Sequence, residues 1–261
     1  MTSSRKRILV TGGAKRAGRR LVEHLSASGH AIIIHANSNA AEADQLCETL
    51  RAKNPDTWSI HADLSDHSAA YALIDQAARL AGGPISGLIN SASVFDYDAP
   101  SAIKLDVLDL ALAVNLRAPA LLSERFFAQA DPARDNCIIN MLDQKLWNLN
   151  PDFFSYTLSK AGLLAVTDMM ARAFAPTVRV NAIAPGLLLP SFDQSQAEFE
   201  AVASRNPMGR PINLDDMTST AEFLLGNTAL TAQILHVDNG QRLAASARDV
   251  MFDARPAKGN G

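Results

Sequence analysis

Residues 7–18 read Arg-Ile-Leu-Val-Thr-Gly-Gly-Ala-Lys-Arg-Ala-Gly, a short apolar run followed directly by a glycine-rich turn. Apolar side chains then recur at helical spacing at Ala17, Leu21 and Leu25, so a helix is expected after the turn. Glycine lets the backbone approach an anion closely, and the N–H groups at the start of a helix attract negative charge. The stretch therefore predicts a strand, a turn that holds the pyrophosphate of a dinucleotide, and a helix. A plain strand-to-helix turn that uses glycine for positive φ is the alternative.

Short β-rich runs and longer helical patterns alternate along the rest of the chain. Seven strands are expected, over residues 7–10, 31–35, 57–62, 87–91, 137–142, 178–183 and 234–237. Helical crossovers between strands require the strands to run parallel. We therefore predict an α/β fold, a Rossmann-type doubly wound sheet of seven parallel strands with helices on both faces. No linker or repeat interrupts the pattern, so residues 1–261 are expected to form one dinucleotide-binding domain with peripheral tails at 1–6 and 244–261.

The composition excludes several classes of function. The 261 residues carry 24 Lys and Arg against 27 Asp and Glu, a net charge of −3, so no basic surface for nucleic acid is expected. No apolar run reaches the roughly 20 residues that span a bilayer, which predicts no membrane partner. The first residues lack the pattern of a signal peptide, so a cytoplasmic location is expected. Cys47 and Cys137 are expected to be buried thiols, and no spacing of ligands suggests a metal.

The end of the second strand bears on the choice of cofactor. His35 ends the strand, and Asn37, Ser38 and Asn39 follow where an NAD site usually places a carboxylate for the ribose. These side chains can donate hydrogen bonds to a 2′-phosphate, and the Arg16 guanidinium could reach the same anion. The segment therefore favours NADP. The alternative is a polar loop in which Asn39 caps the next helix.

Small and polar residues also follow the other strands. Because open α/β sheets bind ligands outside the carboxyl ends of their strands, we expect these residues to converge on one crevice. They are Asp63 after the third strand; Asn90, Ser91, Ala92 and Ser93 after the fourth; Asp143 after the fifth; and Pro185 and Gly186 after the sixth. Asp63 either caps the following helix or accepts a hydrogen bond from the adenine amino group.

Tyr156 and Lys160 are four residues apart, which places the phenol and the ammonium on one face of a helix. A neighbouring positive charge stabilises the phenolate, so the pairing is expected to lower the pKa of Tyr156 toward the range useful for acid–base catalysis. An exposed amphipathic pair is the alternative.

These motifs resemble the short-chain dehydrogenase/reductase family over nearly the whole chain. The resemblance lies in residues 11–18, residues 90–93, Asn115, Tyr156, Lys160 and residues 185–186. It implies binding of the cofactor by Gly12, Arg16, Ala17 and Gly18, and by the polar residues at the strand ends. It further implies that Tyr156 donates a proton, that Lys160 holds the nicotinamide ribose and that Asn115 anchors a water in the proton relay. A homotetramer is also expected from the family.

One position departs from the family pattern and points to a subgroup. Asp143 stands thirteen residues before the tyrosine, where the family usually has a serine. The pteridine reductases and the related dihydromonapterin reductases also carry Asp there, and they share residues 11–18, 40–43, 138–141 and 185–187 with this chain. By that resemblance Phe95 stacks on the pterin, and Ser93 and Arg16 donate hydrogen bonds to the substrate. The subgroup has a basic residue just beyond the second strand, and this chain has residues 37–39 there instead. Selectivity for the 2′-phosphate would therefore depend more on Arg16.

The chemistry of Asp143 favours reduction. A carboxyl group beside a phenol titrates with it as a coupled pair. If Phe95, Leu187 and Leu188 close the crevice, desolvation raises the pKa of Asp143 and retains a proton for donation. The sequence thus predicts an NADPH-dependent reductase of a pterin, with Tyr156 and Asp143 as the proton donors. The alternatives are a general carbonyl reductase acting on 3-oxoacyl thioesters or small ketones, and a non-catalytic nucleotide sensor.

Overall fold

The computed structural model describes residues 5–191 and 193–252. Its centre is one parallel sheet in the order β3-β2-β1-β4-β5-β6-β7. The strands are β1 Arg7–Val10, β2 Ala31–Ala36, β3 Thr57–His61, β4 Gly87–Asn90, β5 Asn136–Met141, β6 Val178–Pro185 and β7 Ile234–Val237. The predicted fold class is confirmed, and no expected strand bound differs from the observed one by more than two residues.

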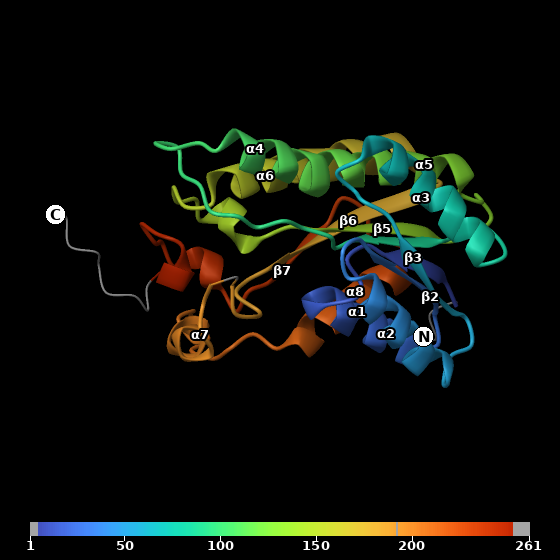
Figure 1. The fold of residues 1–261 in the computed structure, drawn as a ribbon, viewed down its shortest axis with the longest axis horizontal. Helices are drawn as coiled ribbons and strands as arrows, with labels where there is room; N and C mark the ends of the chain where they lie inside the picture. Colours follow the sequence, from blue (N-terminus) through green and yellow to red (C-terminus); the bar gives the residue numbers. More distant parts are fainter. Residues whose placement is uncertain (1–4, 192, 253–261) are drawn as a thin grey trace.

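Helices cover both faces of the sheet (Figure 1). The α-helices are α1 Arg16–Ala27, α2 Ala40–Arg51, α3 His67–Leu80, α4 Leu105–Leu112, α5 Ala118–Gln129, α6 Phe154–Phe174, α7 Gln196–Ala203 and α8 Leu214–Gly226. Helices α1, α2 and α8 lie on one face, and α3 to α6 lie on the other (Figure 1). Within the described residues, no helix is both long and apolar enough to cross a membrane.

The strands alternate their side chains between two cores, as a sheet buried on both faces requires. In β1, Ile8 and Val10 pack in the core under α1 and α8, whereas Leu9 packs in the core under α3 and α5. Ile32 and Ile33 of β2 divide in the same way. Because both faces of the sheet are buried, both sets of alternating side chains are apolar. The central strands are therefore recognisable as short, continuous apolar runs.

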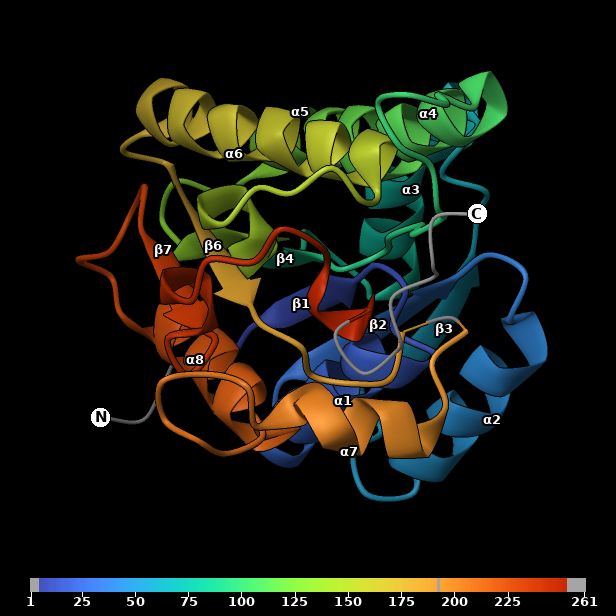
Figure 2. The same ribbon diagram turned by 90° about the vertical axis from the view of Figure 1, so that its left-hand side faces the viewer.

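The predicted tails are not peripheral where the structure describes them. Lys6 is 2% exposed, and its ammonium lies 2.8 Å from Asp135 Oδ2, an anion that Arg179 also pairs with. Residues 1–6 are predicted to be a basic tail, because the sequence alone does not show that the carboxylate of Asp135 lies beside Lys6 in the fold. At the other end, residues 244–252 fold back across the strand ends (red, Figure 2). Residues 1–4 and 253–261 of the predicted tails lie outside the described part.

Candidate active site

A cleft of about 470 Å³ opens at the carboxyl ends of β4, β5 and β6, beside the first turn of α1. The strand ends therefore meet where the topology of an open α/β sheet places a ligand. Twelve predicted site residues line the cleft: Arg16, Ala17, Ser91, Ser93, Phe95, Asp143, Tyr156, Lys160, Pro185, Gly186, Leu187 and Leu188.

A hydrogen-bonded acid pair lies in this cleft. The Tyr156 hydroxyl, on the first turn of α6, donates to Asp143 Oδ2 at 2.8 Å. The other oxygen of Asp143 accepts from the backbone N–H of Lys145 at 2.8 Å, which fixes the carboxyl group at the start of the 3-10 helix Gln144–Trp147. Burial raises the pKa of Asp143. Burial and the Asp143 carboxylate raise the pKa of Tyr156 well above 10. Both groups thus hold their protons more tightly than in water.

Lys160 does not act on Tyr156 as the sequence predicted. Its ammonium donates to the Met141 carbonyl oxygen at 2.8 Å and lies 5.7 Å from the centre of the Tyr156 ring. Burial lowers the pKa of Lys160 to about 8. The expected lowering of the Tyr156 pKa is wrong for this structure, because desolvation and the adjacent Asp143 outweigh the ammonium.

Asn115 lies behind the cleft in a π-helical turn, Ala113–Arg117, between α4 and α5. It is fully buried, and its amide exchanges hydrogen bonds with the backbone N–H and carbonyl of Val94 at 2.9 and 3.0 Å. Its Nδ2 also donates to Ser159 Oγ at 3.1 Å. Single π turns are frequent at functional sites. Here the turn ties the segment after β4 to the helix that carries Tyr156.

The glycine turn is tightly packed. A Cβ on Gly18 would lie 2.2 Å from the Gly12 carbonyl oxygen, and Gly12 has φ +65° with Ala92 Cα 2.9 Å from its ideal Cβ position. Thr11 Oγ1 accepts from the N–H groups of Ser91 and Ala92, which joins the ends of β1 and β4. Thr11 stands inside the turn motif, but nothing in the sequence distinguishes it as a residue that joins two strands.

His35 supports the turn from beneath. It is 1% exposed, and its Nδ1 accepts from Gly12 N at 3.2 Å while Nε2 donates to the Ala62 carbonyl at 3.1 Å. Both nitrogens are engaged only in the neutral ring, and burial lowers the pKa of His35 to about 4. From its place at the end of the second strand, His35 is predicted to bind the cofactor. The structure instead gives it contacts to the turn, and it does not line the cleft.

His35 is therefore expected to titrate near pH 4 in the folded protein. The unfolded chain takes up this proton near pH 6.5, so the free energy of unfolding falls as the pH drops between these values. The loss is about 1.4 kcal/mol per pH unit and roughly 3 kcal/mol in all. NMR titration of the histidine rings, assigned with His35→Gln, measures the pKa directly. A His35 resonance that titrates near pH 6.5 would contradict the buried, neutral ring.

The segment after β2 is open to solvent. Asn37 and Ser38 are exposed, and Asn39 stands at the N-cap of α2 without a capping hydrogen bond from its side chain. Asn39 therefore occupies the N-cap position that the alternative predicted, but its side chain makes no capping hydrogen bond. Asp63 accepts from the N–H and hydroxyl of Ser65 and does not cap α3, whose N-cap is Asp66.

Arg16 and Lys15 point in different directions. Arg16 Nη2 donates to the Pro190 carbonyl at 2.8 Å, and the residue lines the cleft with Phe95 and Leu188. The Lys15 ammonium instead pairs at 2.9 Å with Glu42 in the first turn of α2. The sequence assigned Arg16 to both the 2′-phosphate and the substrate. The structure thus places the Arg16 side chain at the cleft and the Lys15 side chain beside Glu42.

Asn90 and Ala92 lie outside the cleft. Asn90 is buried, and its Nδ2 donates to Asn140 Oδ1 at 2.8 Å, which continues to Thr167 through a further hydrogen bond. Asn90 Oδ1 is buried without a hydrogen-bond partner. The Ala92 backbone is held by Thr11. Both residues thus support the ends of β4 and β5 from within the protein.

Aromatic rings form one wall of the cleft. Phe95 stacks on Phe153 with ring centres 3.9 Å apart, and it meets the Tyr156 ring edge-on at 4.6 Å. On the opposite side, Leu187 N donates to Gln241 Oε1 at 2.9 Å. A Cβ on Gly186 would lie 2.4 Å from the same oxygen, so only glycine fits this turn without displacement.

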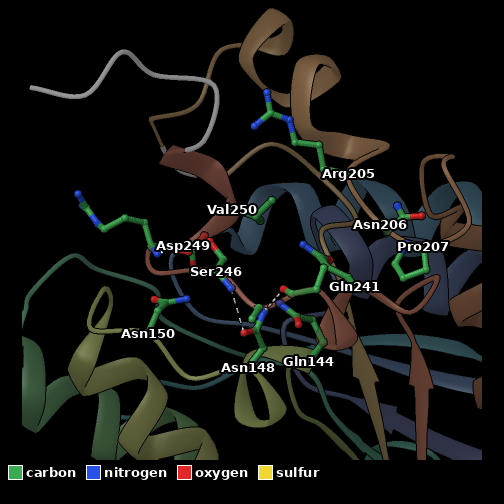
Figure 3. A pocket seen from close by; sticks show the side chains of 13 residues that line it. Gln144, Asn148, Asn150, Arg205, Asn206, Pro207, Gln241, Ser246, Asp249 and Val250 are labelled. Carbon is green, nitrogen blue, oxygen red and sulfur yellow. Dashed lines mark hydrogen bonds between the residues drawn. The ribbon is translucent and has the colours of Figure 1, made fainter.

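Several residues that line the cleft are not among the site residues predicted from the sequence. Asp249 and Val250 line it, and with Gln144 and Gln241 they also line a second cavity of about 400 Å³. In Figure 3, the side chains of Gln144, Asn148 and Gln241 gather around this second cavity. No spacing or charge pattern pointed to residues 244–252, because their partners lie far away in sequence. Among the described residues, no cluster of three or more possible ligands suits a metal ion.

Comparison with known proteins identifies the family. A sequence model of the family described as enoyl-(acyl carrier protein) reductase matches residues 13–242, from the glycine turn to beyond β7. The chain belongs to the short-chain dehydrogenase/reductase family. It is accordingly an oxidoreductase.

The chain is similar to three proteins of known description. A crystal structure from Brucella canis, described as FolM alternative dihydrofolate reductase 1 complexed with NADP, is 35% identical with a TM-score of 0.88; it covers 95% of this chain and 99% of its own. An NADPH-dependent aldehyde reductase-like chloroplastic protein from Arabidopsis thaliana is 26% identical over 89% of this chain and 92% of its own. The 3-oxoacyl-[acyl-carrier-protein] reductase FabG of Staphylococcus aureus is 25% identical over 90% and 97%.

Proposed function

We propose that this chain is an NADPH-dependent reductase that transfers a hydride to a pterin-type heterocycle. The observation that carries the proposal is the hydrogen bond from Tyr156 to Asp143 in the cleft, where a carboxyl group replaces the usual serine. The similarity to the Brucella protein supports it, because dihydrofolate contains a pterin ring.

The residues around the glycine turn fit the pyrophosphate of NADPH. Helix α1 begins at Arg16. Its N-cap residue, Lys15, makes no side-chain capping hydrogen bond, and the first turn has no acidic residue. The N–H groups of Arg16, Ala17 and Gly18 have no acceptor within the helix, and they suit an anion. NADPH, when bound, supplies the hydride.

Tyr156 and Asp143 supply the proton that accompanies the hydride. Reduction of a C=N bond adds the hydride to carbon and the proton to nitrogen. The raised pKa of Tyr156 keeps the phenol protonated, and the raised pKa of Asp143 lets the carboxyl group replace the proton that the phenol gives up. Lys160 would hold the nicotinamide ribose, and Asn115 would position a water in the relay.

The other lining residues suit a flat heterocycle. Phe95 provides an aromatic face, since its ring lines the cleft and is fixed by Phe153. Leu187 and Leu188 provide apolar contacts from the loop after β6. Ser93 and the Arg16 guanidinium provide hydrogen-bond donors, which suit the carbonyl oxygen and ring nitrogens of a pterin.

The second candidate function is general carbonyl reduction, which the names of the Arabidopsis and Staphylococcus relatives favour. An assay of NADPH consumption against dihydropterins, dihydrofolate, small ketones and 3-oxoacyl thioesters tests both. Turnover of a dihydropterin is expected. Turnover of ketones or thioesters alone would support the second candidate, and NADPH binding without any turnover would indicate a sensor.

Lys15→Ala and Arg16→Ala separate the two basic residues of the turn. Lys15→Ala should weaken NADPH binding about tenfold and NADH binding little, since one charge-assisted contact to the 2′-phosphate is lost. Arg16→Ala should instead raise the KM of the pterin. Fluorescence titration with both cofactors and steady-state kinetics measure the effects. The assignment fails if Arg16→Ala, and not Lys15→Ala, removes the preference for NADPH.

Besides binding a small-molecule substrate, the chain is expected to associate with copies of itself. The expected assembly is a homotetramer. Helices α4 to α6 expose large apolar side chains at Leu105, Leu110, Phe127, Leu158 and Met169. Burial of these side chains between subunits would remove apolar surface from water and so favour association.

A further inference from the structure

The segment 244–252 is fastened across the cleft by polar contacts to the loop after β5. Asn148 Nδ2 donates to the Ala244 carbonyl at 2.7 Å. Asp152, which is 2% exposed, accepts at 2.8 Å both from the Arg248 guanidinium and from the Asp249 backbone N–H. These contacts connect positions almost 100 residues apart in sequence, and Figure 2 shows the segment in front of the strand ends.

Lys145 connects this segment to the acid pair. It is 2% exposed, and its ammonium lies 2.9 Å from Asp249 Oδ2 and 2.6 Å from Asn150 Oδ1. The backbone N–H of the same residue donates to Asp143 Oδ1 at 2.8 Å. One buried residue therefore holds the carboxyl group of the acid pair with its backbone and the C-terminal segment with its side chain.

Apolar contacts of the segment reach the acid pair as well. Met251 is 1% exposed and belongs to one cluster with Phe153 and Tyr156. Phe252 stacks on Phe153 with ring centres 6.0 Å apart, on the same ring that supports Phe95. Asp249 and Val250 line the cleft themselves. Displacement of the segment would thus remove part of the cleft wall and loosen the aromatic support beneath Phe95.

We propose that Lys145 and Asp249 are a positioning pair: their buried ion pair holds residues 244–252 as a wall of the substrate cleft and ties that wall to Asp143. The role of the wall in binding substrate rests on the proposed reductase function. A buried lysine without its carboxylate is strongly unfavourable, so the segment and Lys145 are expected to move together.

Asp249→Asn tests the pair with little change in shape. The KM of the substrate should rise about tenfold while the Kd of NADPH stays within about twofold, because the segment contacts the substrate side. The charge of Asp249 opposes ionisation of Asp143 and Tyr156, so the alkaline limb of the pH profile should shift to lower pH. The charged groups that face Asp249 are Lys145, Arg248, Asp152 and Asp143. Asp215→Asn, which removes the exposed Arg20 to Asp215 pair, is the matched control and should change neither quantity.

A double-mutant cycle distinguishes coupling from independent damage. Lys145→Met should raise the KM by a similar factor, and Lys145→Met/Asp249→Asn should be no worse than the worse single variant. A chain ended after Leu243 should show at least the same rise in KM with NADPH binding retained. The proposal would be overturned if the KM of the double variant rose by the product of the two single factors, or if Asp249→Asn left the KM unchanged. Both results can be obtained even if the shortened chain fails to fold.

Measuring every variant with both a dihydropterin and a small ketone separates the two proposals. If the wild type reduces only ketones, the pterin assignment fails, and a rise in the ketone KM on Asp249→Asn still supports the positioning pair. If pterin reduction is strong and Asp249→Asn leaves its KM and pH profile unchanged, the positioning pair fails and the proposed function stands.

Discussion

Asp143→Ser is expected to lower kcat/KM for a dihydropterin by about 10²–10⁴, the usual contribution of a positioned acid or base. In the structure the two oxygens of Asp143 accept from Tyr156 and from the Lys145 N–H, and a serine hydroxyl cannot replace both contacts. The Asp143 carboxylate also raises the pKa of Tyr156, so its removal should move the alkaline limb of the pH profile to lower pH. NADPH binding should be retained.

Asp143→Asn is the matched control for this experiment, because it keeps the size of the side chain and removes the ionisable group. It should lose the proton-donating function as Asp143→Ser does. Steady-state rates with a dihydropterin and a ketone, measured from about pH 5 to 9, cover the ordinary pKa of histidine and the pKa of Lys160, which burial lowers to about 8. Pterin reduction that is unchanged in Asp143→Ser would remove the acid role and favour a carbonyl reductase, whose ketone activity would persist.

Tyr156→Phe should reduce kcat by about 10²–10⁴ for every substrate, since it removes the hydroxyl that delivers the proton. The aromatic ring, which is 7% exposed and packs edge-on against Phe95, is kept. Protein stability and NADPH affinity should therefore change little. Stopped-flow or steady-state NADPH oxidation measures the loss.

Tyr71→Phe is the control for loss of a phenol, because Tyr71 lies 44% exposed on α3, away from the cleft. Its activity should match the wild type. A Tyr156→Phe variant that retains more than about a tenth of the wild-type kcat would mean that another group provides the proton.

The sequence was sufficient for the sheet and for the position of the cleft. Strands buried on both faces read as short apolar runs, as in residues 31–34, and parallel strands bring their carboxyl ends to one edge. The glycine turn and Asp143 follow such strands, and Tyr156 lies soon after one of them. Topology therefore predicts that these residues lie close together at one edge of the sheet. The Tyr156 hydroxyl lies 2.8 Å from Asp143 Oδ2, so the two groups are adjacent, as expected for the coupled pair that the resemblance implied.

Contacts between distant charges were not predictable in this way. Lys145 and Asp249 are 104 residues apart, and neither belongs to a periodic pattern. The buried Lys6 was likewise indistinguishable from a solvated charge until Asp135 was placed beside it. The pKa of Tyr156 was predicted with the wrong sign because the sequence shows the neighbouring Lys160 and does not show the extent of burial.

The transfer of hydride to a pterin ring is tested most directly by isotope labelling. The wild-type protein would be incubated with NADPH deuterated at both C4 positions of the nicotinamide and with equal concentrations of a dihydropterin and a small ketone. Mass spectrometry of both products then shows which substrate received the deuterium. We expect one deuterium on a ring carbon of the reduced pterin and little labelled alcohol. Deuterium in the alcohol with an unlabelled, unreduced pterin would contradict the assignment.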